Sequence, residues 1–200
     1  MAVDLGHVLS QMDAVALDFE TTGSAPGALN SPWQIGLVVI HCGKVDMEHS
    51  FQSYLRVPED HPFNPYTPGR WAQIRTELSQ APTLQDLWPV LRPFLQGMPL
   101  VAHHAPTERG MLAQELPLQH FGPWVDTLTI ARQAFPRQRD YKLENLIPNL
   151  GLAGIQQGRC PDGAPHDAFY DAVACGTFLE NILSAPGWNA LSLEQFTALK

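Results

Sequence analysis

Apolar residues fall into short runs in the first part of the chain. The first run, residues 14–17, leads into a carboxylate and breaks at a threonine pair and a glycine, so it predicts a buried strand ending in a turn. A second run covers residues 33–40, and after a turn at 42–44 polar and apolar residues alternate over 45–55. This pattern predicts a hairpin whose last strand is a half-exposed edge. Two further short strands are expected, at residues 99–103 and 124–125.

Helical spacing of apolar residues predicts helices in the rest of the chain, and over residues 83–95 it is regular. Asp126 is expected to cap the helix that follows it. We expect helices at residues 2–12, 83–95, 106–116, 127–134, 141–150, 167–183 and 193–199. Residues 56–70, with four prolines, and 154–165, with three glycines and two prolines, are expected to be loops. A hairpin followed by alternating strands and helices predicts an α/β domain with a mixed central sheet.

Composition suits one compact domain with proline-punctuated loops, because 200 residues include 44% hydrophobic residues, 16% charged residues and 18 prolines. The net charge of -8 disfavours broad, non-specific binding of duplex nucleic acid. It leaves open a narrow site in which bound metals supply the positive charge.

Three scattered cysteines predict a reducing compartment and no disulfide framework. Residues 1–11 lack the basic and apolar regions of a signal peptide. No apolar run approaches the ~20 residues that span a membrane. We therefore expect a cytoplasmic protein that does not insert into a membrane.

Two carboxylates stand where the first strand ends. Asp18 and Glu20 point to the same face of a strand, because side chains alternate along it. Like charges so close need neutralisation, and divalent cations prefer carboxylate oxygens. The alternative interpretation is a structural acidic patch satisfied by a lysine or by the amides of the turn.

Three more residues are weak candidates when each is taken alone. Glu108 falls in the first turn of a helix, where a carboxylate complements the helix dipole without further purpose. Asp171 lies on an otherwise apolar helix face and needs a partner or a metal. His166 stands five residues before Asp171, so the two converge only if His166 precedes the first helical turn, with Asp167 as the N-cap.

Taken together, these residues resemble the signature of the DnaQ-like 3′→5′ exonucleases of the DEDDh type, which have a ribonuclease H-like fold. The sequence LDFETTG at 17–23 matches the first motif, AHHAPTE at 102–108 the second and HDAFYD at 166–171 the third. Segments 126–132 and 141–146 also match. The resemblance implies a mixed sheet of about five strands, one antiparallel, flanked by helices. It implies one exonuclease domain over residues 1–200, with a core at 14–183 and a tail at 184–200.

The resemblance also implies an activity and a set of site residues. The chain would be a metal-dependent 3′→5′ exonuclease that uses two divalent cations, Mg²⁺ or Mn²⁺, to release nucleoside 5′-monophosphates from single-stranded DNA or RNA. His166 would take the proton from the attacking water. The metal ligands would be Asp18, which bridges both cations, with Glu20, Asp171 and Glu108. The residues that receive the substrate would be Thr21, Thr22 and His104.

The second motif departs from the family pattern. Glu108 stands in place of the usual aspartate, and His104 and Thr107 replace an asparagine and a phenylalanine. A usual HGI segment is also not recognisable near residues 70–74. An alternative is therefore a catalytically weak or silent module of the same fold that binds nucleic acid or a polymerase or repair partner. The sequence does not decide between DNA and RNA.

Overall fold

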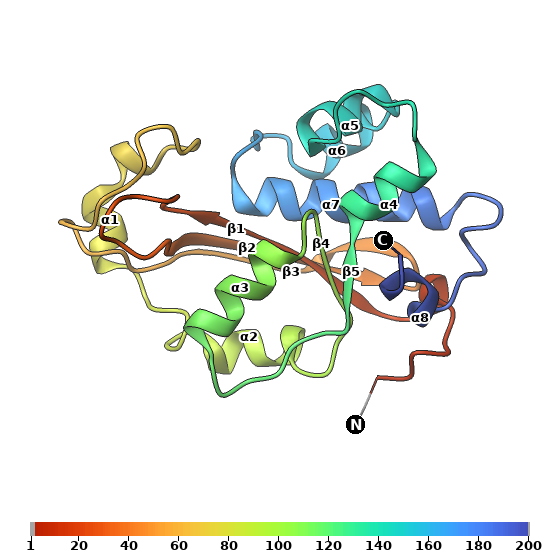
Figure 1. The fold of residues 1–200 in the computed structure, drawn as a ribbon, viewed down its shortest axis with the longest axis horizontal. Helices are drawn as coiled ribbons and strands as arrows, with labels where there is room; N and C mark the ends of the chain where they lie inside the picture. Colours follow the sequence, from red (N-terminus) through yellow and green to blue (C-terminus); the bar gives the residue numbers. More distant parts are fainter. Residues whose placement is uncertain (1–2, 200) are drawn as a thin grey trace.

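The computed structural model describes residues 3–199, and its centre is a five-stranded sheet in the order β3-β2-β1-β4-β5 (Figure 1). Strand β2 runs antiparallel to both of its neighbours, whereas β1, β4 and β5 are parallel to one another. The strands are β1 (Ala14–Thr21), β2 (Pro32–His41), β3 (Lys44–Tyr54), β4 (Leu100–Ala102) and β5 (Trp124–Asp126). The predicted mixed sheet with one antiparallel strand and a half-exposed edge at β3 is confirmed.

Helices cover both faces of the sheet (Figure 1). On one side lie α4 (Thr127–Ala134), α5 (Leu143–Asn149), α6 (Ala153–Arg159) and α7 (Ala168–Leu183). On the other side lie α2 (Trp88–Leu95) and α3 (Pro106–Glu115). Shorter elements are η1 (Leu9–Gln11), η2 (Trp71–Gln73), α1 (Arg75–Gln80) and α8 (Leu193–Thr197).

Strand β1 is buried on both faces, which explains its unbroken apolar run. Ala14 and Ala16 pack in the core that α7 covers, and Val15 and Leu17 pack in the core under α2 and α3. Because side chains alternate along a strand, Asp18 and Glu20 point to the same side as Ala14 and Ala16, which is the side that α7 covers.

The N-terminus of α7 lies directly on β2 at Gly36. A Cβ atom built there would approach the Phe169 backbone to 2.3 Å, so only glycine permits this contact. The side chain of Gln34 fixes the same junction, since its Nε2 donates to Asp167 Oδ2 at 2.8 Å and its Oε1 accepts from the Ala168 N–H at 3.3 Å. The close approach brings the start of α7 beside the end of β1.

Two predicted helices and one predicted loop differ from the structure. Only η1 forms within the expected helix at 2–12, whose residue 2 lies outside the described residues. Helix α2 begins at Trp88, not at residue 83, because Thr83 and Asp86 close a turn through their side chains. The expected loop at 154–165 is wrong for its first part, which is helix α6. The other predicted helices, including the Asp126-capped α4, are confirmed to within about two residues at most of their ends.

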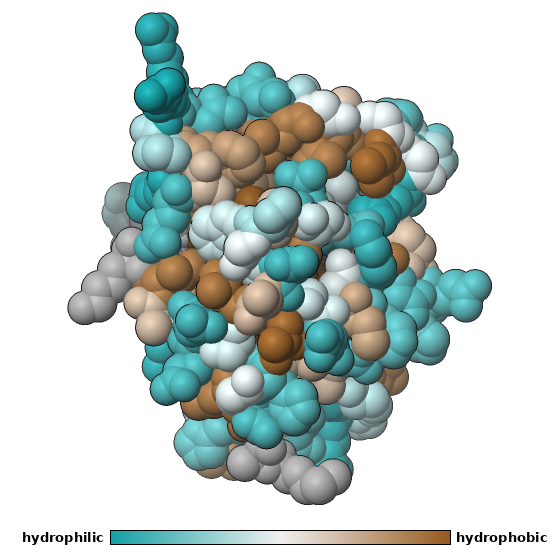
Figure 2. All heavy atoms as spheres, turned by 90° about the vertical axis from the view of Figure 1, so that its right-hand side faces the viewer, coloured by the Kyte–Doolittle hydropathy of each residue, from teal (hydrophilic) through white to brown (hydrophobic). Residues whose placement is uncertain are grey.

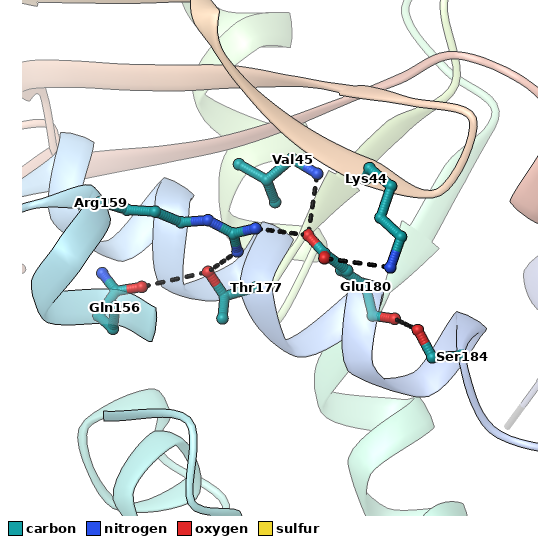
Figure 3. Close-up of polar contacts among 7 residues, drawn as sticks. All are labelled: Lys44, Val45, Gln156, Arg159, Thr177, Glu180 and Ser184. Atoms are coloured by element: carbon teal, nitrogen blue, oxygen red, sulfur yellow. Dashed lines mark hydrogen bonds and ion pairs between the residues drawn. The ribbon is translucent and has the colours of Figure 1, made fainter. Parts of the chain in front are cut away.

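A polar network ties α6 and α7 to the β2–β3 hairpin (Figure 3). Arg159 binds Glu180 at 2.7 Å and donates to Thr177 Oγ1 at 2.8 Å. Glu180 also accepts from the Val45 N–H at 3.0 Å and pairs with Lys44 at 3.3 Å. Each partner of the Arg159–Glu180 pair is mostly buried, so the network fixes α6 against α7.

The outer surface at the α8 end mixes hydrophilic and hydrophobic side chains, with a hydrophobic band across the upper part of that face (Figure 2). Within residues 3–199 we find no helix with the length and hydropathy that a membrane-spanning segment requires.

Candidate active site

Asp18 and Glu20 stand near the carboxyl end of β1, opposite Gly36 and Gln34 of β2. Glu20 is 7% exposed, and a register shift after it marks the point where β1 leaves the regular ladder. Both side chains therefore leave the sheet on the side where α7 begins.

The start of α7 brings His166 and Asp171 to the same place. Asp167 caps the helix by accepting from the N–H groups of Phe169 and Tyr170. His166 precedes this cap with a φ of 67°, and its N–H donates to Asp171 Oδ2 at 3.0 Å. Ligand-type atoms of Glu20, His166 and Asp171 all lie within 4.8 Å of one another. The arrangement required by the five-residue spacing, with His166 before the first turn, is confirmed.

Glu108 approaches the site from α3, which follows β4. It is 3% exposed, and its Oε2 atom has no hydrogen-bond partner among the described residues. A buried carboxylate without a partner carries a large desolvation cost. Its charge acts on Asp18, which places it within electrostatic reach of the β1 carboxylates.

Burial, followed by repulsion between neighbouring charges, raises the pKa values of these carboxylates. Burial, followed by the charges of Asp171, Asp167 and Glu108, raises the pKa of Glu20 to about 8. Burial raises the pKa of Glu108 to about 8 and that of Asp171 to about 7, the latter against a hydrogen bond from the His166 N–H.

Asp18 is the residue on which the other charges act together. Burial and then the charges of Glu108, Asp171 and Glu20 raise the pKa of Asp18 well above its usual range. A hard cation offsets the cost of ionising these buried carboxylates, because it binds their charged oxygens. The unpartnered Glu108 oxygen and the ligand atoms that converge around Asp171 are suited to binding divalent metal ions.

A cavity of about 280 Å³ opens beside these residues, and several of its side chains were not among the predicted site residues. Glu144 Oε2 lies 3.4 Å from His166 Nε2. The His103 ring bridges Thr127 Oγ1 and the Tyr141 carbonyl, and burial lowers its pKa, so it is a neutral support. The lining consists of Asp18, His103, Lys142, Leu143, Glu144, Pro165, His166 and Asp171. The match of segment 141–146 was the only sequence signal for Glu144 and Lys142.

The predicted substrate residues lie in three different settings. The Thr22 side chain is fully buried and accepts from the Ser31 N–H at 3.0 Å, so it supports the loop after β1. Thr21 is half-buried, and its carbonyl accepts from Trp33 Nε1 at 3.2 Å. His104 is exposed with a φ of 77°.

Comparison with known families agrees with this geometry. The model of the exonuclease family RNase_T matches residues 15–178, which is most of the chain. The chain belongs to this exonuclease family. Family membership identifies it as a nuclease and confirms its resemblance to the DnaQ-like enzymes. A search among curated proteins found no significant match.

Solved structures share the fold of this exonuclease-family chain. The nuclease domain of 3′hExo, a DEDDh family member bound to rAMP, has a TM-score of 0.68 at 17% identity, over 94% of this chain and 100% of that chain. The *S. pombe* protein Pop2p in its Mg²⁺ and Mn²⁺ bound form has a TM-score of 0.66 at 13% identity, over 94% and 89%.

A third structure, *E. coli* Exonuclease I in complex with a dA16 oligonucleotide, has a TM-score of 0.63 at 15% identity. The match covers 88% of this chain but 41% of that one, so this chain corresponds to less than half of Exonuclease I. At these identities the three matches establish a common fold.

Proposed function

We propose that the chain is a divalent-metal-dependent 3′→5′ exonuclease that releases nucleoside 5′-monophosphates from single-stranded DNA or RNA. The observation that carries the proposal is the meeting of Glu20, His166 and Asp171 within 4.8 Å, beside two further buried or half-buried carboxylates. Membership of the exonuclease family supports this reading.

Four carboxylates from three elements would hold the metals. Asp18, Glu20 and Asp171 would hold one cation, and Asp18 would share the second with Glu108. When bound, two such cations stabilise the charge on the attacking and leaving oxygens of a phosphodiester. The orphaned oxygen of Glu108 supports its inclusion in this set.

His166 would act as the general base. Its side chain is exposed and lies ahead of α7, so its ring is free of the helix backbone. In this role it takes a proton from the attacking water, and Glu144, 3.4 Å from Nε2, stabilises the resulting imidazolium. The exposed His104 and the half-buried Thr21 would receive the terminal nucleotide. Thr22 would support them from within the fold, because its backbone N–H and carbonyl bind Ser31 and Asn64.

A variant tests the role of His166. His166→Ala is expected to lower kcat by roughly 10²–10⁴-fold, which is the usual contribution of a general base. The loss should not exceed this range, because the four carboxylates stay in place. Thermal unfolding with and without Mn²⁺ checks that this variant still folds and still responds to metal. Full activity of His166→Ala would exclude it as the base.

The direct test of the function is a degradation assay. We would incubate the protein with 5′-labelled single-stranded DNA and RNA of equal sequence, in Mg²⁺, Mn²⁺ or EDTA, beside Asp18→Asn. We expect a metal-dependent ladder that shortens from the 3′ end and is absent in the variant. No cleavage by the natural protein with either metal would reject the proposed activity and favour the silent binding module.

A further inference from the structure

The connection between α4 and α5 concentrates positive charge on an acidic molecule. This connection, residues 135–142, is named the basic segment. It carries Arg137, Arg139 and Lys142, three of the 12 lysines and arginines of a chain with a net charge of -8. Arg137 and Arg139 are exposed, and neither pairs with a carboxylate among residues 3–199. Their charges are therefore available to a ligand.

Internal hydrogen bonds fix the shape of the basic segment. The Tyr141 hydroxyl donates to the Phe135 carbonyl at 2.9 Å, which joins the two ends. Asp140, its only acidic residue, accepts from the Lys142 N–H at 3.0 Å and from Asn145 Nδ2 at 2.6 Å. The carboxylate is thus engaged at the start of α5, while the two arginines face the solvent.

The basic segment ends at the carboxylate site. The Tyr141 carbonyl accepts from His103 Nε2 at 2.7 Å, and Lys142 lines the cavity that His166 and Asp171 also line. Lys142 follows Arg137 by five residues, so Arg137 lies at most ~18 Å along the chain from a residue that lines this cavity.

We propose that the basic segment binds the phosphate backbone of the substrate strand and leads its 3′ end to the carboxylate site. The proposal rests on the proposed function, and it adds a binding surface outside the reacting centre. Phosphate contacts of this kind position a strand without reading its sequence. The overall negative charge of the protein repels the strand elsewhere, so the unpaired Arg137 and Arg139, on a segment that ends at the site, have a large effect on where it binds.

The test compares a double variant, which carries both Arg137→Gln and Arg139→Gln, with the control Arg92→Gln. Arg92 is exposed on α2, on the opposite side of the sheet from α7, and hydrogen-bonds only to Gln96 in the described structure. Each protein is assayed with two substrates. One is a single strand of about 20 nucleotides. The other is the p-nitrophenyl ester of thymidine 5′-monophosphate, whose single phosphate would occupy the carboxylate site without reaching the arginines. Binding of the labelled strand is measured separately by fluorescence anisotropy, with Asp18→Asn added to every protein to prevent cleavage.

We expect the double variant to raise KM for the strand roughly tenfold and to leave hydrolysis of the ester unchanged, since only the strand reaches the arginines. The slope of log K against log salt for strand binding should become shallower by about 1.4, because each lost phosphate contact on a single strand contributes ~0.7. Arg92→Gln should match the natural protein in both measurements.

The outcomes separate this proposal from the proposed function. If the natural protein cleaves both substrates but the double variant keeps its KM and salt slope, the basic segment is rejected and the exonuclease stands. If nothing is cleaved but the double variant loses strand binding, the basic segment is supported and the activity is rejected. If no strand binds to any of the proteins, the basic segment is rejected.

Discussion

Glu108 is the residue at which the site departs most from the family motif. The glutamate is one methylene longer than the usual aspartate, and the structure buries it with one oxygen unpartnered. Burial raises its pKa to about 8, so without metal it is mostly protonated at neutral pH. We infer that Glu108 binds a ligand, because a buried carboxyl with an unpartnered oxygen destabilises the fold unless a ligand engages it.

Glu108→Gln tests this inference. The amide is neutral without binding a proton, whereas folded Glu108 must take up a proton that the unfolded chain releases, so the metal-free variant should unfold at a higher temperature by the equivalent of roughly 1 kcal/mol or more. The increase in melting temperature caused by Mn²⁺ should shrink, and strand hydrolysis should fall at least ~100-fold. Glu108→Asp, which restores the family residue, is the control and should keep the response to Mn²⁺. A Glu108→Gln protein that responds fully to Mn²⁺ would show that Glu108 is not a ligand.

At the scale of elements, the contact between β2 and α7 decides whether the site assembles. Gly36 lets the Phe169 backbone approach, and this contact sets the start of α7, from which His166 and Asp171 project. A displacement of this helix end would separate these residues from Glu20, whose ligand atoms now lie within 4.8 Å of theirs.

Gly36→Ala should therefore affect both stability and activity. The added methyl group clashes with backbone, which cannot move away cheaply, so we expect a loss of roughly 1–3 kcal/mol in the free energy of unfolding. Strand hydrolysis should fall more than the folded fraction does. Gly110→Ala on α3 is the control: nothing lies within 4 Å of its new Cβ, and it should gain up to ~1 kcal/mol from helix propensity. Chemical denaturation and assays on the same samples measure both effects.

The elements also show what the sequence could and could not predict. Local patterns sufficed for the five strands and for the Asp126 and Asp167 caps, since alternation and capping are short-range signals. Helix α6 escaped prediction because its buried side is built on Gln156, a polar residue held by Thr177 and the Tyr170 carbonyl. The contact of Glu144 with His166 joins residues far apart in sequence, and no local pattern encodes it.

For the whole molecule, the carboxylates near His166 make stability depend on pH. Their raised pKa values, about 8 for Glu20 and Glu108 and about 7 for Asp171, mean that the folded state holds protons which the unfolded chain releases above pH 4.5. Stability must therefore fall as pH rises toward 8, by at most ~1.4 kcal/mol per pH unit for each proton held.

Several other titrating groups change the stability of the protein only at pH values outside the range from 6.5 to 8.5. Burial opposes the charge of Glu180, but the Val45 N–H and Arg159 hold its pKa below 4.5, so its contribution is lost only in acid. Burial lowers the pKa of His103 below 6.5, and the stability lost through it appears only as pH falls below that value. Burial raises the pKa of Cys160 from 9.0 to about 11, and the stability lost through it appears as pH rises through 9, where the unfolded thiol ionises. The interval therefore isolates the carboxylate site.

We expect the metal-free protein to lose stability steadily from pH 6.5 to 8.5, as measured by urea denaturation in EDTA. Saturating Mg²⁺ or Mn²⁺ should flatten or reverse this trend, because metal binds the deprotonated oxygens and its stabilisation grows with pH. Asp18→Asn should respond weakly to metal over the same interval, since it removes the ligand that both cations share. Stability that rises with pH in EDTA would contradict the raised pKa values. An equal response to metal at both ends of the interval would mean that the cation binds elsewhere than at these four carboxylates.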